Sequence, residues 1–288
     1  MPAWTPDGPD LVVAGDNALV LPALPDESFQ LVYLDPPFNT GRAQRRQPVT
    51  TTRSASGRRV GFQGQTYDTV RGQLRRYDDT FEDYWAFLEP RLEQVWRLLT
   101  ASGTLYLHLD YRESHYAKVL LDALFGRECF LNELIWAYDY GARARHRWPT
   151  KHDTILVYVK DPARYHFDNE AVDREPYRAP GLVTPEKAAR GKLPTDVWWH
   201  TIVSPTGREK TGYPTQKPEG VLRRIVQASS RPGDWVLDCF AGSGTLGAVA
   251  APLGRRYVLA DHNPEAVEVM AQRLAAHGPR VITAAELG

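Results

Sequence analysis

The sequence has few cysteines, no long apolar run and no net charge, and each absence narrows the range of functions. Cys129 and Cys239 are the only two cysteines among 288 residues. Their spacing matches no metal-binding or redox motif, so we expect free, buried thiols and no metal site. No stretch approaches the roughly 18 apolar residues that a membrane span requires. The start at Met1 lacks the basic and apolar segments of a secretion signal, so we expect a cytoplasmic protein.

The zero net charge conceals an uneven distribution of arginine. Lys and Arg together number 35, as do Asp and Glu, which argues against a protein that simply coats nucleic acid. Residues 41–76 nevertheless hold nine arginines against one acid, Asp68, and residues 143–151 form a second basic run. A basic face can contact phosphates within a neutral protein. Solvated surface loops are the alternative interpretation of either run.

Apolar runs and amphipathic stretches alternate along the chain. Apolar runs predict strands at residues 11–13, 30–34, 104–109, 133–138, 154–160, 235–239 and 256–260. The spacing of apolar residues predicts helices at 80–100, 113–125, 218–230, 242–253 and 264–277, and Pro90 is able to divide the first of them in two. This alternation is typical of an α/β fold in which helices cover both faces of a mostly parallel sheet.

Two polar segments interrupt the alternation. Residues 41–76 have few aliphatic side chains, which predicts a mobile surface segment that becomes ordered on binding. Residues 161–210 are rich in proline and arginine, which makes them the candidate for a small inserted substrate-reading region. We therefore expect a first half at 1–160, this small region, and a second half at 211–288.

A glycine turn follows the apolar run at 235–239. The segment Asp238-Cys239-Phe240-Ala241-Gly242-Ser243-Gly244-Thr245 reads as strand, turn and helix, and its glycines let a ligand approach the backbone. Asp261 ends the next predicted strand, where an acid can bind ribose hydroxyls. An ordinary strand-to-helix turn and a NAD-dependent dehydrogenase are the alternatives. The third glycine, Gly247, falls within the helix, and Asp238 favours a ligand with an amino-acid amino group, which NAD lacks.

The turn Asp35-Pro36-Pro37-Phe38 follows the predicted strand at 30–34. Two prolines fix φ twice and remove two backbone donors, so the turn offers the Asp35 carboxylate and the Pro36 carbonyl as acceptors. Two acceptors directed at an exocyclic NH2 group would hold its nitrogen in a pyramidal form, with the lone pair free for methyl transfer. Phe38 would stack on a flipped base. A plain surface loop is the alternative.

Together these motifs resemble the DNA amino-methyltransferases, in the β arrangement of their motifs. Asp35–Phe38 resembles the catalytic motif, and Phe240–Thr245 resembles the cofactor motif. Similar segments lie between them: the family's central strand at Gly103–Asp110, its late hairpin strand at Lys151–Tyr158, and the segment that precedes the cofactor motif at Gly212–Pro218. The resemblance covers most of the chain. One departure is Asp261, followed by His262, where the family more often has Glu.

The resemblance implies a Rossmann-like fold of α/β class with a mostly parallel seven-stranded sheet and a permuted motif order. It implies S-adenosylmethionine as cofactor, bound through Asp16, Lys217, Asp238, Phe240, Ala241, Gly242, Ser243, Gly244, Thr245 and Asp261. Asp16 would lie near the adenine and Lys217 near the methionine carboxylate. The catalytic residues would be Asp35, Pro36, Pro37 and Phe38. Phosphate contacts are expected from Arg42, Arg45, Arg46, Arg143, Arg145, Arg147 and Lys151.

The implied reaction is site-specific methylation of adenine N6 in duplex DNA by base flipping, because Asp at the first motif position is more typical of the adenine group. Cytosine N4 is the alternative, since the same turn can hold that amino group. An RNA or protein methyltransferase and a non-catalytic DNA-binding module are further alternatives. The arginine-rich stretch and the inserted region favour duplex DNA. The resemblance also allows a homodimer and a cognate restriction endonuclease.

Overall fold

The computed structural model describes residues 4–39, 84–139, 143–204 and 206–287, and between residues 39 and 84 the backbone of five short strands. The chain divides into two compact units. Unit 1 comprises Met1–Phe38 and Asp83–Gly288, and unit 2 comprises Asn39–Glu82. Residues 161–210 belong to unit 1, and their role in substrate reading stays a prediction.

Unit 2 contains antiparallel strand pairs. β3 (Gln44–Arg46) pairs with β7 (Arg75–Tyr77), and β6 (Thr66–Arg71) pairs with both β4 (Val49–Arg53) and β5 (Arg59–Val60). The sequence predicted a mobile surface segment here, because residues 41–76 have few aliphatic side chains. Its backbone nevertheless forms strand ladders, and the expected mobility stays a prediction.

The core of unit 1 is a sheet of nine strands in the order β11-β9-β10-β8-β2-β12-β13-β1-β14. All neighbours are parallel except the two pairs made by β10. The strands are β1 (Leu11–Ala14), β2 (Phe29–Leu34), β8 (Leu99–Leu109), β9 (Phe130–Ala137), β10 (His152–Val159), β11 (Val197–Trp199), β12 (Trp235–Asp238), β13 (Arg256–Asp261) and β14 (Arg280–Thr283).

The expected seven strands are all present, together with two edge strands that the sequence analysis missed. β11 has three residues and β14 has four, and each buries a single side chain. Such short, exposed segments lack the apolar run that identifies a strand in a sequence. The fold is therefore the expected α/β class with a wider sheet.

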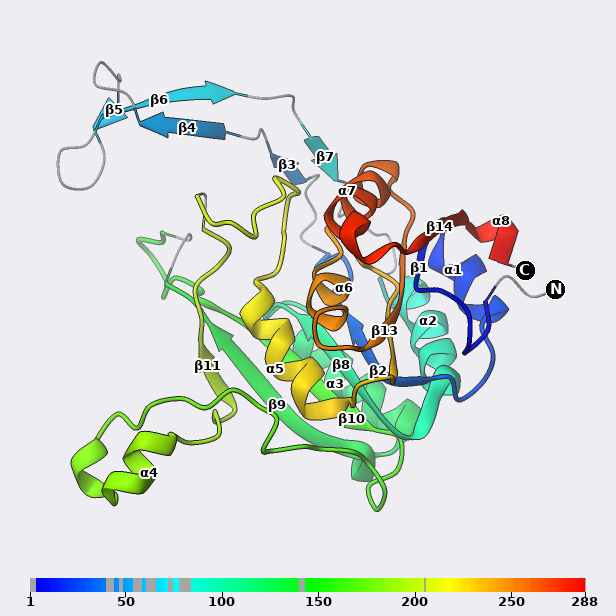
Figure 1. Cartoon of the computed structure of the whole chain (residues 1–288), viewed down its shortest axis with the longest axis horizontal. Coiled ribbons are helices and arrows are strands. Elements are labelled where there is room, and N and C mark those ends of the chain that lie inside the picture. Colours follow the sequence, from blue (N-terminus) through cyan, green and yellow to red (C-terminus); the bar gives the residue numbers. More distant parts are fainter. Residues whose placement is uncertain are drawn as a thin grey trace. The chain divides into compact units, whose positions relative to one another are not determined.

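Helices cover both faces of this sheet. They are α1 (Asn17–Val20), α2 (Tyr84–Leu98), α3 (Ser114–Phe125), α4 (Pro185–Arg190), α5 (Glu219–Ser229), α6 (Thr245–Ala250), α7 (Pro264–Leu274) and α8 (Ala284–Leu287), with short 3-10 turns at Leu21–Ala23, Arg127–Cys129, Pro180–Leu182 and Ala275–His277. In Figure 1, α5, α6 and α7 lie in front of the sheet and α2 and α3 behind it. None of the helices within the described ranges is long and apolar enough to cross a bilayer.

Pro90 does not divide the first long helix, contrary to one expectation from the sequence. α2 runs without interruption from Tyr84 to Leu98 with Pro90 inside it. Pro90 is exposed, whereas Leu88 and Leu92 on either side are fully buried. Burial of both halves against the core outweighs the loss of one backbone hydrogen bond.

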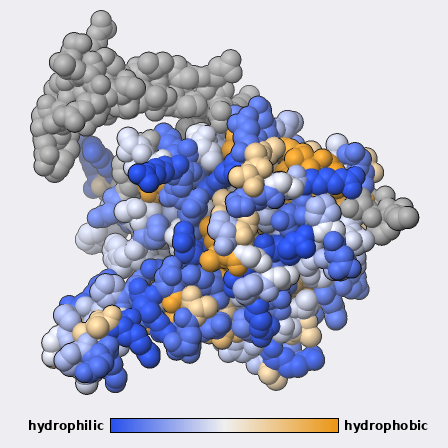
Figure 2. Space-filling model, viewed as in Figure 1, coloured by the Kyte–Doolittle hydropathy of each residue, from blue (hydrophilic) through white to orange (hydrophobic). Residues whose placement is uncertain are grey.

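Apolar side chains are gathered inside the molecule. Both faces of β2 are buried along its whole length, which is characteristic of a central parallel strand. Both cysteines are buried free thiols, as expected. Figure 2 shows hydrophilic residues over most of the viewed face, with small apolar patches between them.

The connections between strands change direction between β2 and β12. These parallel neighbours pair through Leu237 and Val32. The chain leaves β2 through α2 toward β8 on one side, and leaves β12 through α6 toward β13 on the other. This change of direction is a topological switch point, where open α/β sheets bind ligands at the carboxyl ends of their strands. Asp35 and Asp238 stand at these two strand ends.

Candidate active site

The carboxylate of Asp35 has two oxygens with different surroundings. Oδ2 accepts a hydrogen bond from the Lys217 ammonium at 2.5 Å, and the side chains of Asp35 and Lys217 are 16% and 10% exposed. Oδ1 is buried and has no hydrogen-bond partner among the described residues. Burying a polar atom without a partner is costly. This oxygen therefore marks a place where a donor from a bound molecule fits.

Phe38 lies at the other end of the same turn. Its ring centroid is 4.9 Å from the Lys217 ammonium and 5.9 Å from the centroid of the His108 ring. Pro36 is buried, whereas Pro37 and Phe38 are partly exposed. The turn thus has a buried proline next to Asp35 and a partly exposed aromatic ring, at the carboxyl end of β2.

The glycine turn after β12 requires glycine for steric reasons. Gly242 has a φ of 50° and Gly244 a φ of 70°, in the left-handed region that favours glycine. A Cβ on Gly244 would also lie 2.8 Å from Met270 Cγ. At Gly247, within α6, a Cβ would lie 2.7 Å from Leu259 Cδ1. The third glycine therefore serves close packing of the helix on β13 and completes the glycine spacing of nucleotide-binding turns. Contrary to the interpretation of the sequence, its place in the helix does not argue against NAD.

Two carboxylates beside the turn determine which ligand charge it suits. Asp261 Oδ2 accepts a hydrogen bond from Gly242 N at 2.8 Å, and Asp238 Oδ1 accepts one from Phe240 N at 2.9 Å. Burial raises the pKa of both carboxyls, that of Asp238 well above its usual range, and the neighbouring charge of Asp35 raises it further. A bound cation would stabilise the ionised forms of these carboxyls, whereas a pyrophosphate would disfavour them further. The site therefore fits S-adenosylmethionine better than NAD.

Asp16 lies at the same edge of the sheet. The residue before it, Gly15, donates its N–H to the carbonyl of Asp261 at 3.0 Å. Asp16 Oδ1 caps α1 by accepting from Ala18 N at 2.9 Å and also accepts from Arg91 Nη2 at 3.0 Å. The structure thus brings Asp16 next to the end of β13. Its contact with the adenine of the cofactor stays a prediction.

Ser243 and Thr245 use their side chains to brace the turn. Their hydroxyl oxygens are 3.2 Å apart, and Arg273 Nη1 donates to the Ser243 carbonyl at 3.1 Å. Thr245 Oγ1 donates to the Lys217 carbonyl at 3.2 Å. Both side chains are buried, so a cofactor would meet the backbone of this segment.

The segment Gly212–Pro218 presents Lys217 from the start of α5. Gln216 spans the loop, because its Oε1 accepts from Thr211 N at 2.8 Å and its Nε2 donates to the Glu209 carbonyl at 2.6 Å. Lys217 is thereby directed at Asp35. The expected contact of Lys217 with the methionine carboxylate stays a prediction.

A buried polar chain behind Phe38 was missed as a functional feature in the sequence. The hydroxyl of Tyr33 lies 2.7 Å from His108 Nδ1, and His108 Nε2 lies 3.3 Å from Asp153 Oδ2. Tyr138 donates its hydroxyl proton to Asp153 Oδ1 at 3.0 Å. The His108 side chain is fully buried. The sequence signal that could have revealed this chain was His108 and Asp153, two polar residues inside apolar strands. Their contact could not be predicted, because it depends on the register in which the strands pair.

The expected phosphate-binding residues fall into two groups. Arg42 lies outside the described residues, and Arg45 and Arg46 belong to β3 of unit 2, where only the backbone is described. The second group lies in the loop between β9 and β10. Arg143, Arg145 and Arg147 are exposed there, and Lys151 donates to the Asp139 carbonyl at 3.2 Å. Contact of either group with DNA stays a prediction.

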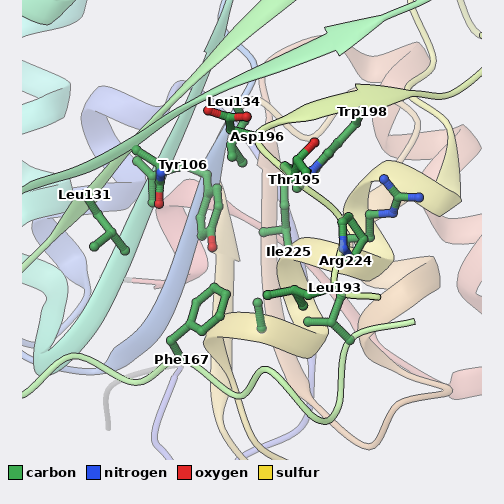
Figure 3. A pocket seen from close by; sticks show the side chains of 15 residues that line it. Tyr106, Leu131, Leu134, Phe167, Leu193, Thr195, Asp196, Trp198, Arg224 and Ile225 are labelled. Atoms are coloured by element: carbon green, nitrogen blue, oxygen red, sulfur yellow. The ribbon is translucent and has the colours of Figure 1, made fainter. Parts of the chain in front are cut away.

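Part of the polar region 161–210 packs on the front face of the sheet. It encloses, together with β8, β9 and α5, a cavity of about 350 Å³. Figure 3 shows Tyr106, Phe167, Trp198 and Ile225 around this cavity. The region is thus anchored to the sheet through apolar contacts. Within the described parts of the chain, no group of three or more His, Cys, Asp or Glu residues is arranged to hold a metal ion.

The fold and the acids around the glycine turn define the class as an S-adenosylmethionine-dependent methyltransferase. The profile of the family described as DNA methylase matches residues 29–273. The chain belongs to this family of N6-adenine and N4-cytosine DNA methyltransferases. It is an S-adenosylmethionine-dependent enzyme that methylates amino groups of DNA.

Individual relatives span nearly the whole chain. It is 30% identical over 261 residues to the type II methyltransferase M.HpaI of Haemophilus parainfluenzae, with 90% of this chain and 72% of that one covered. It is 29% identical over 272 residues to the DNA adenine methyltransferase YhdJ of Escherichia coli strain K12, with 91% and 82% covered. The structure resembles that of M1.HpyAVI in complex with S-adenosylmethionine at a TM-score of 0.58 and 18% identity, with 92% and 98% covered.

Proposed function

We propose that this enzyme methylates the exocyclic N6 of an adenine that is flipped out of duplex DNA at one recognition sequence. The observation that carries the proposal is Asp35 Oδ1, which is buried without a hydrogen-bond partner among the described residues. It lies at the carboxyl end of β2, beside the switch point of the sheet. The amino group of adenine supplies the donor that this acceptor lacks.

The chemistry follows from two acceptors and one cation. Asp35 Oδ1 and the Pro36 carbonyl accept the two N–H groups of the target and so hold its nitrogen lone pair away from the ring. Lys217 fixes Oδ2, which leaves Oδ1 free to accept. S-adenosylmethionine supplies a methyl group activated by the sulfonium. As the nitrogen gains this methyl, the S–CH3 bond breaks and leaves a neutral thioether, and the nitrogen loses one proton, which Asp35 would accept. Phe38 stacks on the flipped base.

The cofactor-binding residues fit the charge of S-adenosylmethionine. Asp238 is buried at the end of β12, where its carboxylate would bind the ammonium of the methionine moiety. Asp261 would bind the ribose hydroxyls, and its contact with Gly242 N fixes its orientation. The backbone from Phe240 to Thr245 would line the same site. Lys217 would bind the methionine carboxylate only by sharing its ammonium with Asp35.

Adenine is the proposed base because the first residue of the catalytic turn is Asp35. A carboxylate at this position resembles the adenine-specific members of the family. One relative, YhdJ of Escherichia coli, is named as a DNA adenine methyltransferase. Both observations favour N6 of adenine over N4 of cytosine.

The substrate that we propose for the enzyme is duplex DNA. Arg143, Arg145 and Arg147 are exposed next to the active-site edge and would contact its phosphates. Arg42, Arg45, Arg46 and Lys151 would add to these contacts. M.HpaI is named a type II methyltransferase, which supports a cognate restriction endonuclease for this chain. We further propose that the enzyme is a homodimer. We expect it in the cytoplasm, where bacterial DNA is found.

The test is to express the chain in a bacterial host without DNA methylation of its own. Its genomic DNA is then digested to nucleosides and mapped for modified bases. The proposal predicts N6-methyladenine confined to one sequence motif. N4-methylcytosine alone would refute the choice of adenine. No modified base in DNA from cells that contain the folded protein would refute transfer to DNA.

A further inference from the structure

Trp148 is the most exposed large apolar side chain in the described part of the chain. Its side chain is 92% exposed, and it lies in the loop between β9 and β10 with exposed arginines at positions 145 and 147. Single exposed apolar residues are common on protein surfaces. An indole that follows two exposed arginines, however, combines an apolar ring with charges that attract phosphates.

The strand registers place this loop at the same edge as the catalytic turn. Ala137 at the end of β9 pairs with His152 at the start of β10, and Thr154 pairs with Leu109 at the end of β8. β8 is the direct neighbour of β2, which ends next to Asp35. With strands about 4.8 Å apart, β9 lies roughly 15 Å from β2. A duplex bound over the catalytic turn would therefore reach this loop within a few base pairs.

Contacts at both ends of the loop connect it to the site. Tyr138 N donates to the Lys151 carbonyl at 2.9 Å, and the Tyr138 hydroxyl donates to Asp153, which also contacts His108 behind Phe38. Arg147 Nη1 lies 3.5 Å from the Tyr111 hydroxyl. The base of the loop is thus held against the site.

Pro149 restricts the residue directly before it. A residue that precedes proline is confined to extended conformations, which reduces the backbone freedom of Trp148. The indole is therefore presented to solvent by a restrained backbone.

We propose that Trp148 enters the base stack of the duplex at the target site and fills the gap that the flipped adenine leaves. The inference rests on the proposed base-flipping reaction. Extrusion of a base costs unpairing and unstacking energy, and apolar side chains inserted at a base step offset such costs. The neighbouring arginines hold phosphates next to the gap. Trp148 is a positioning residue in this role, because it acts on the duplex and not on the reacting nitrogen.

The test compares two DNA substrates and three variants. One duplex carries the mapped recognition sequence, and in the other the target adenine lies opposite an abasic site, so that it is already unpaired. Trp148→Ala and Trp148→Phe are compared with Tyr116→Ala, which removes an aromatic ring that is 67% exposed on α3. The readout is kcat/KM for transfer of labelled methyl.

Trp148→Ala should lose on the order of 10- to 100-fold in kcat/KM on the paired duplex and recover most of it on the abasic one. Trp148→Phe should retain most of the activity, and Tyr116→Ala should match the wild type on both. Equal rates for Trp148→Ala and wild type on the paired duplex would overturn the proposal. An equal loss on both duplexes would also overturn it, because the role would then not depend on opening the pair.

A binding experiment separates this proposal from the proposed function. Stacking on bases quenches indole fluorescence, so titration of wild type with the unmodified duplex should quench an emission that Trp148→Phe lacks. This readout needs no methyl transfer. Absence of methylated DNA with the wild type would refute the proposed function alone. Identical quenching in wild type and Trp148→Phe would refute the role of Trp148 alone.

Discussion

Lys217 Nζ lies 2.5 Å from Asp35 Oδ2, although 182 positions separate the two residues in the sequence. The contact joins the turn after β2 to the segment that begins α5. It leaves Asp35 Oδ1 as the oxygen without a partner among the described residues. The turn after β2 and the segment before the glycine turn are therefore linked by an ion pair, which orients the Asp35 carboxylate.

Replacement of Lys217 should impair transfer more than cofactor binding. Lys217→Met removes the donor to Oδ2, so the Asp35 carboxylate is free to rotate and Oδ1 loses its fixed position. We expect kcat to fall at least about tenfold, or about 1.4 kcal/mol of transition-state stabilisation. Lys187→Met on exposed α4 is the control. A large loss of S-adenosylmethionine affinity in calorimetry, with kcat unchanged, would instead assign Lys217 to the methionine carboxylate.

Gly244→Ala should destabilise the fold. Gly244 has a φ of 70°, and an added Cβ would lie 2.8 Å from Met270 Cγ in the packed helix α7. We expect a loss of about 1–3 kcal/mol in the free energy of unfolding, measured by urea denaturation. Gly181→Ala is the matched control, because nothing lies within 4 Å of its added Cβ. Equal stabilities of the two variants would contradict the steric account of the turn.

Asp153 should make stability depend on acid pH. Burial tends to raise the pKa of this carboxyl, but hydrogen bonds from His108 and Tyr138 and the charges of His108 and Lys217 outweigh burial and leave the pKa below 3.8. A carboxyl with a depressed folded-state pKa stabilises the fold fully above its unfolded value and loses this contribution as the pH falls through the folded value.

Unfolding of Asp153→Asn should therefore show a smaller change between neutral pH and about pH 3 than the wild type. The variant should also disturb Phe38 through His108, and so lower kcat without changing cofactor affinity. An unchanged pH dependence would show that the buried chain does not stabilise the ionised carboxyl.

The loop between β9 and β10 should contribute salt-dependent affinity for DNA. If Arg143, Arg145 and Arg147 each neutralise one phosphate, replacing all three by Ala should lower the slope of log K against log salt by up to about 2.7. Arg127→Ala is the control, since Arg127 is exposed before β9 at the opposite edge of the sheet. A slope unchanged from the wild type would mean that the loop is merely solvated.

The sequence predicted the framework of the site better than its contacts. β2 and β12 are buried strands whose apolar runs are plain in the sequence. Asp35 directly follows β2, and Asp238 is the last residue of β12. Trp198 and Val281 lie in edge strands too short and exposed to show such a run. The pairing of Lys217 with Asp35 was not predicted, because the family resemblance assigned Lys217 to the cofactor.

The register in which distant strands pair explains why the sequence did not predict the remaining side-chain contacts of the site. Tyr33 and His108 meet because β2 and β8 pair in one register, with Tyr33 opposite Tyr106. A shift of one residue would turn these side chains to opposite faces. Composition and periodicity place residues in strands, but the distances between side chains on neighbouring strands follow from packing of the whole sheet.

Asp35 is proposed to hold the amino group of adenine during transfer. The most direct measurement is the identity and rate of the labelled nucleoside that wild type and Asp35→Ala form on duplex DNA. We expect labelled N6-methyl-2′-deoxyadenosine with the wild type. With Asp35→Ala we expect a rate lower by a factor of about 10²–10³ at unchanged cofactor affinity. Transfer by Asp35→Ala at the wild-type rate, or label found only in N4-methylcytosine, would contradict this proposal.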